Sequence, residues 1–171
     1  MRTHRSLWTL TTPTRDFPTL PGDLTVDVAV IGGGMAGLTT AWLLKCAGKR
    51  VAVLEMNRIL SGQTGQTTAH LTELLDTPYA TLRRDFGEKG ARLAASSSRA
   101  AIEQMASLVE ELGLDCDFQR VPMFQYAQTA RELQSLEDEL SAARDAGLLA
   151  TLTQRVPLPF AVKGALRVED Q

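Results

Sequence analysis

A glycine-rich turn between a buried strand and a helix limits the folds open to this chain of 171 residues. The run Val26–Gly32 is apolar and β-branched and ends in glycine, which is typical of a parallel strand buried on both faces. Residues Met35–Ala47 are apolar at helical spacing and stop at Gly48, and Arg50–Glu55 predicts a second strand. Strand, helix and strand within about 30 residues predict a βαβ unit with a right-handed crossover.

The glycines of this turn match G-x-G-x-x-G at Gly32, Gly34 and Gly37, a pattern that binds dinucleotides. Gly32 permits the tight turn, Gly34 leaves space for a diphosphate, and Gly37 lets the helix approach the strand. Met35 and Ala36 begin the helix, whose free N–H groups and positive dipole end attract the diphosphate. The turn is therefore the first candidate binding site.

An acidic residue, Glu55, ends the second predicted strand, 23 positions after Gly32. At this place a carboxylate accepts hydrogen bonds from an adenosine ribose, and its charge repels a 2′-phosphate, which argues against NADP. The alternative is that the glycines only form a turn and that Glu55 caps a surface loop.

The spacing after Glu55 bears on which dinucleotide is bound. A nicotinamide dehydrogenase continues with a short helix and a third parallel strand, whereas the next strand-like segment here begins at Phe118, 63 residues later. The polar loop Met56–Thr68 comes first, and its part Ser61–His70 offers hydroxyls and backbone amides that suit a second, long arm of cofactor. An NAD-dependent dehydrogenase with a large insertion is the less favoured reading.

The second half of the chain predicts helices and short strands. Thr129 and Glu132 form a capping box before one of the helices. The expected helices are Tyr79–Phe86, Lys89–Leu112 and Ala130–Ala146, and the expected strands are Phe118–Val121 and Met123–Ala127.

Composition excludes several classes of partner. Lys and Arg number 18 against 20 Asp and Glu, a formal net charge of −2 without the basic stripe that nucleic-acid binding requires. No apolar run approaches the ~18 residues of a membrane span. Cys46 and Cys116 lie outside any C-x-x-C pattern, so no metal or iron–sulfur site is expected within this chain. We expect a reduced, cytoplasmic protein.

Three segments resemble the FAD-dependent oxidoreductases of the D-amino-acid oxidase and sarcosine oxidase superfamily. They are DVAVIGGGMAGLTTAWLL, LEMNR and SGQTGQTTAHLT, which begin at Asp27, Leu54 and Ser61. The chain is most similar to the N-terminal part of a bacterial branch in which the flavoprotein half precedes a C-terminal Rieske domain. SLW, GLDCDFQRVPMFQYA and PLPFAVKGALRVEDQ add to this resemblance.

The resemblance implies FAD with its diphosphate at the glycine-rich turn and its adenosine ribose at Glu55. In such enzymes a C–N bond of an amine or amino-acid substrate gives a hydride to the flavin, which then passes electrons to an acceptor. A Rieske [2Fe–2S] cluster would belong to a C-terminal domain outside this chain. The loop would pass the ribityl chain and the ring edge, with contacts from Ser61, Gly62, Thr64, Thr67, Thr68 and His70.

One departure from the family leaves the catalytic residues unassigned. Many relatives carry an Arg-Asn pair where this chain has Gln66, Thr67 and Thr68. Substrate contacts of those relatives therefore do not transfer.

The expected fold class is α/β: a Rossmann-like FAD-binding domain with a helical insertion and the start of an α+β substrate domain. Its parts are an extended arm with Pro13, Pro18 and Pro21 (1–25), the βαβ unit and flavin loop (26–75), the helical insertion (76–116) and the start of the substrate domain (117–171). A parallel sheet needs more strands than these, so we expect an incomplete fold with an unpaired sheet edge and exposed apolar surface. The alternative function is a catalytically incomplete fragment that at most binds a nucleotide.

Overall fold

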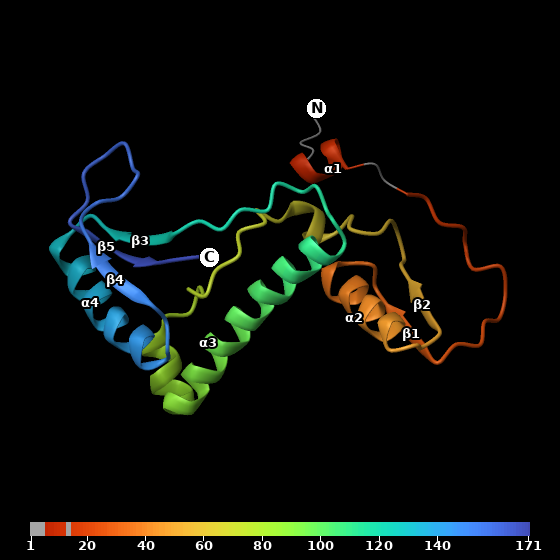
Figure 1. The fold of residues 1–171 in the computed structure, drawn as a ribbon, viewed down its shortest axis with the longest axis horizontal. Coiled ribbons are helices and arrows are strands. Elements are labelled where there is room, and N and C mark those ends of the chain that lie inside the picture. Colours follow the sequence, from red (N-terminus) through yellow and green to blue (C-terminus); the bar gives the residue numbers. More distant parts are fainter. Residues whose placement is uncertain (1–5, 13–14) are drawn as a thin grey trace. The chain divides into compact units, whose positions relative to one another are not determined.

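The computed structural model describes residues 6–12 and 15–171, and the chain divides into two compact units, residues 1–70 and 71–171 (Figure 1). In the described residues the first unit carries a sheet of two parallel strands, and the second carries a sheet of three antiparallel strands. The chain is therefore a mixed α/β protein, as expected.

The first unit contains the predicted βαβ arrangement. Strands β1 (Val28–Ile31) and β2 (Val51–Leu54) pair in parallel, from Val28 opposite Val51 to Ile31 opposite Leu54. Asp27, just before β1, joins the starts of the two strands. Its carboxylate accepts hydrogen bonds from the backbone N–H and the guanidinium of Arg50, just before β2, at 2.8 and 3.1 Å. Helix α2 (Met35–Cys46) lies between the two strands in the chain, so all three predicted elements are confirmed.

The expected extended arm is wrong for part of its length. Residues Leu7–Thr11 form the short helix α1, because the hydroxyl of Ser6 caps it by accepting a hydrogen bond from the N–H of Thr9 at 3.3 Å. Residues 15–25 contain no helix or strand, as predicted. Pro13 lies outside the described residues.

The second unit begins with the long helix α3 (Tyr79–Glu111), which bends at Gly87, where φ is 72° and ψ is 174°. This bend separates the two helices that the sequence predicts. Strand β3 (Met123–Ala127) and helix α4 (Ala130–Asp145) are also confirmed, including the capping box of Thr129 and Glu132. Strands β4 (Ala150–Thr153) and β5 (Gly164–Val168) complete an antiparallel sheet in the order β3-β5-β4.

The predicted strand Phe118–Val121 is wrong. Only Val121 pairs there, exchanging two backbone hydrogen bonds with Gln171 at 3.1 and 3.2 Å. The strand that pairs with β5 on the side opposite β3 is β4, which no local pattern predicted. Its pairing with β5 brings residues 150–153 beside residues 165–168, a contact that depends on the intervening chain turning back.

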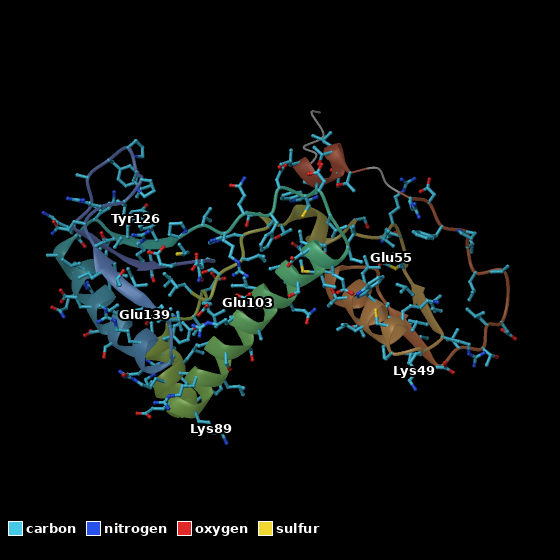
Figure 2. The ribbon with its side chains drawn as sticks, in the orientation of Figure 1. Lys49, Glu55, Lys89, Glu103, Tyr126 and Glu139 are labelled. Atoms are coloured by element: carbon cyan, nitrogen blue, oxygen red, sulfur yellow. The ribbon has the colours of Figure 1, made fainter. Side chains whose placement is uncertain are left out.

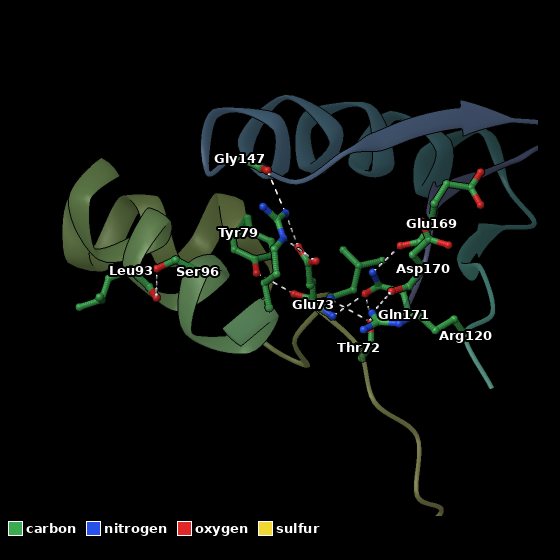
Figure 3. Close-up of polar contacts among 12 residues, drawn as sticks. Thr72, Glu73, Tyr79, Leu93, Ser96, Arg120, Gly147, Glu169, Asp170 and Gln171 are labelled. Atoms are coloured by element: carbon green, nitrogen blue, oxygen red, sulfur yellow. Dashed lines mark hydrogen bonds and ion pairs between the residues drawn. The ribbon is translucent and has the colours of Figure 1, made fainter. Parts of the chain in front are cut away.

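Polar side chains tie together the start of α3 and the end of the chain (Figure 3). The fully buried Tyr79 donates its hydroxyl to the carbonyl oxygen of Glu73 at 2.6 Å, and the Glu73 carboxylate pairs with Arg99 at 2.6 Å. The side chain of Gln171 accepts hydrogen bonds from Thr72 and from the N–H of Glu73. Burial, with the nearby negative charges of Glu73 and Glu139, raises the pKa of Tyr79 to about 12.

The first unit exposes much apolar surface. Helix α2 has no buried residue although most of its residues are apolar, and Ile31 of β1 is 78% exposed. Among the described helices none is both long and apolar enough to cross a membrane.

Candidate functional site

The glycine-rich turn has the backbone geometry that only glycine permits at two positions. Gly32 has a φ of 100°, in the left-handed region. A Cβ on Gly37 would collide with the carbonyl oxygen of Gly32 and would lie 3.1 Å from its carbonyl carbon. These two glycines let α2 begin directly against the end of β1, as the sequence predicts.

The N-terminus of α2 is open to an anion. Gly34 is its N-cap without a side-chain cap, and its first turn contains no acidic residue. The N–H groups of Ala36 and Gly37 have no hydrogen-bond partner among the described residues, while the N–H of Met35 donates to the hydroxyl of Thr64 at 3.0 Å. Free N–H groups at a positive helix end fit the diphosphate of a dinucleotide.

Two glycines have structural reasons that the sequence did not show. A Cβ on Gly34 would lie 3.2 Å from the Thr64 hydroxyl, so this glycine admits the loop as well as a ligand. Gly33 is buried, and a Cβ there would lie 2.8 Å from Cγ2 of Ile59. The loop after β2 is therefore packed directly against the glycine-rich turn.

Glu55 lies just beyond the end of β2 (Figure 2), and its carboxylate binds the turn. Its Oε1 accepts a hydrogen bond from the N–H of Asn57 at 2.9 Å, and its Oε2 accepts one from the N–H of Gly33 at 2.7 Å. These two bonds lower the pKa of the Glu55 carboxyl. Because a carboxylate offers about four acceptor sites, it retains capacity for ribose hydroxyls.

Replacing Glu55 by glutamine is expected to destabilise the first unit in a pH-dependent way. The folded-state pKa of Glu55 lies below its usual value of 4.5, so its contribution is fully present above that value and is lost as the pH falls through the lowered pKa. Urea unfolding followed by tryptophan fluorescence should show a wild-type advantage at pH 7 that disappears in acid. An advantage unchanged down to pH 2 would contradict this role.

The loop after β2 contains the 3-10 helix η1 (Gln63–Gln66) and is held in a strained conformation. Leu60 and Ala69, at its two ends, have φ of 62° and 56°, which costs free energy in a residue with a Cβ. A Cβ on the buried Gly65 would collide with the carbonyl oxygen of Leu60. Such strain concentrates at ligand-binding sites.

The structure brings only part of the predicted site together. Thr64 contacts the turn directly, whereas Thr68 and His70 are exposed and form no hydrogen bond within residues 6–12 and 15–171. Ser61 and Gly62 are exposed and bond only within the loop. The residues that meet at the turn are Gly32, Gly34, Met35, Ala36, Gly37, Glu55 and Thr64.

Trp8 is a loop contact that the sequence motifs did not predict. Its indole Nε1–H donates to the carbonyl oxygen of Thr67 at 2.7 Å. In the sequence only the tripeptide SLW points to this residue, and no rule of spacing links it to the loop. In the described part of the chain, no three His, Cys, Asp or Glu side chains form a group that could hold a metal ion.

Residues 27–171 match the protein family described as FAD dependent oxidoreductase (DAO), and the chain belongs to this family. Among its relatives is YhfW of Bacillus subtilis, named as a Rieske 2Fe-2S iron-sulfur protein. It is 34% identical over 164 residues, which are 96% of this chain and 32% of YhfW. Gamma-glutamylputrescine oxidoreductase of Escherichia coli is 31% identical over 72% of this chain and 29% of its own length.

Solved structures show the same fold. Glycine oxidase from Geobacillus kaustophilus aligns with a TM-score of 0.68 at 22% identity, covering 85% of this chain and 39% of the oxidase. L-amino acid deaminase from Proteus myxofaciens also gives a TM-score of 0.68, at 16% identity, covering 98% of this chain and 36% of the deaminase. The chain thus spans about a third of the length of the relatives it matches.

Proposed function

We propose that this chain is the cofactor-binding portion of an FAD-dependent oxidoreductase that oxidises a C–N bond of an amine or amino acid. The observation that carries the proposal is the uncapped N-terminus of α2, with two free N–H groups, at a turn whose Gly33 donates its N–H to Glu55. Family membership supports FAD, and the relatives named for putrescine derivatives, glycine and L-amino acids support the substrate class.

In this proposal the turn and Glu55 bind the diphosphate and the adenosine ribose of the cofactor. Gly32, Gly34 and the N–H groups at the start of α2 hold the diphosphate, and Glu55 accepts the ribose hydroxyls. The loop residues Ser61, Gly62, Thr64, Thr67, Thr68 and His70 line the flavin arm. When bound, FAD supplies the acceptor for the hydride of the substrate. The chain's own part is to bind and orient the cofactor.

The exposed apolar surface of the first unit supports a larger sheet in the working protein. Ile31 at the end of β1 and Leu43 on α2 are 78% and 50% exposed, and further parallel strands and helices would cover such faces. We retain the four-part division at residues 1–25, 26–75, 76–116 and 117–171 as part of the proposal. The name of YhfW supports a Rieske domain in a longer protein.

Titration of the 171-residue chain with FAD and with NAD tests the proposal. We expect FAD to bind with one site per chain and with a changed visible flavin spectrum, and a large excess of NAD not to displace it. Preferential binding of NAD would favour the dehydrogenase reading instead. Turnover of amino acids by the chain with added FAD would rule out the catalytically incomplete fragment.

A further inference from the structure

We propose that helix α1 belongs to the cofactor site and that Trp8 is a positioning residue for the loop of residues 61–68. The inference rests on the proposed function, in which this loop lies along the flavin arm of FAD. The contact that carries it is the hydrogen bond from the indole Nε1–H of Trp8 to the carbonyl oxygen of Thr67. It joins a segment before β1 to the loop after β2.

Helix α1 also covers the loop. Cγ2 of Thr9 lies 3.7 Å from the position of a Cβ built on Gly65. Gly65 is buried although its neighbours Gly62, Gln63 and Gln66 are exposed. The loop backbone thus packs against α1 on one side, and the indole of Trp8 holds its position at Thr67.

The loop has a second anchor, at the N-terminus of α2. The N–H of Thr67 donates to the carbonyl oxygen of Thr64 at 3.5 Å, a long bond, and the hydroxyl of Thr64 accepts the N–H of Met35 at 3.0 Å. Because the bond between the two threonines is long, the Thr67 end of the loop can shift while the hydroxyl of Thr64 stays on the N–H of Met35. Trp8 thus acts on the flavin arm of the site through Thr67 and does not touch the turn.

The strain in the loop explains why an external contact is needed. Leu60 and Ala69 are held at positive φ, a conformation that persists only where the surrounding structure imposes it. Removing the indole N–H frees the segment between them to relax. The flavin arm of the site should then lose its preformed shape, while the diphosphate and ribose positions at Gly34 and Glu55 stay in place.

Binding of FAD and of ADP to the full chain separates these effects. Replacing Trp8 by phenylalanine removes the donor and keeps a ring, so we expect the Kd for FAD to rise about fivefold, the usual effect of one hydrogen bond. The Kd for ADP, which reaches only the turn and Glu55, should stay within about twofold. The visible circular dichroism of bound FAD should change as well.

Trp42→Phe is the matched control, because Trp42 is the other tryptophan of the chain and its indole forms no hydrogen bond in the described residues. It should leave both Kd values and the flavin signal unchanged. The remaining tryptophan in each variant reports the urea midpoint of the first unit.

The outcomes distinguish this inference from the proposed function. Equal weakening of FAD and ADP by Trp8→Phe, or an unchanged Kd for FAD, overturns the role of Trp8 while FAD binding by the wild type stands. A wild-type chain that binds ADP but not FAD overturns the proposed function, and the role of Trp8 with it.

Discussion

Replacing Gly37 by alanine is expected to lower FAD affinity by about 30-fold and to destabilise the first unit by about 2 kcal/mol. Helix propensity alone would favour alanine by about 1 kcal/mol. The new Cβ, however, would collide with the carbonyl oxygen of Gly32, a backbone atom that no side-chain rotation can move away. Helix α2 must therefore shift away from β1, and its N–H groups leave the diphosphate position.

Gly22→Ala is the matched control, because nothing lies within 4 Å of a Cβ built on Gly22. Flavin fluorescence measures the affinity, and tryptophan fluorescence follows unfolding of the first unit, which contains both tryptophans, Trp8 and Trp42. A Gly37→Ala protein that binds FAD as tightly as the Gly22→Ala protein would contradict the assignment of the turn.

Replacing Glu139 by alanine is expected to lower the free energy of unfolding of the second unit by about 3 kcal/mol. Glu139 lies on α4 (Figure 2) and is only 5% exposed. Its two oxygens accept the N–H groups of Tyr79 and Ala80 at 2.7 and 3.0 Å, at the start of α3. These N–H groups belong to the first turn of a helix whose N-cap, Pro78, has no side-chain cap. Removal of the carboxylate leaves them without partners.

Glu137→Ala on the exposed face of the same helix is the control and should change stability by less than about 0.5 kcal/mol. Glu139→Gln, which keeps one acceptor oxygen, should lie between the two. The tyrosine signal in near-ultraviolet circular dichroism follows the second unit, since Tyr79 and Tyr126 both belong to it. A loss below 1 kcal/mol for Glu139→Ala would show that water replaces the carboxylate at this helix end.

Part of the candidate site could be predicted because it depends on neighbours in the sequence. Gly32 and Gly37 are required by the local path of the chain from β1 into α2, and this requirement is visible in their spacing. The place of Glu55 could be predicted because an acidic residue ends the second strand of such a βαβ unit. The loop residues were harder to predict. Only Thr64 of the predicted six reaches the turn, and its bond to Met35 spans 29 residues.

Local signals in the sequence were enough to predict β1, α2 and β2 from their periodicity, two helices within the range of α3, and the start of α4 from its capping box. Only the folded chain shows that Trp8 holds Thr67, that Glu139 caps α3 from another helix, and that β4 exists. Hydrogen bonds and strand pairs of this kind join residues that are distant in sequence. They form only when the chain has folded back on itself, so no periodicity or motif can encode them.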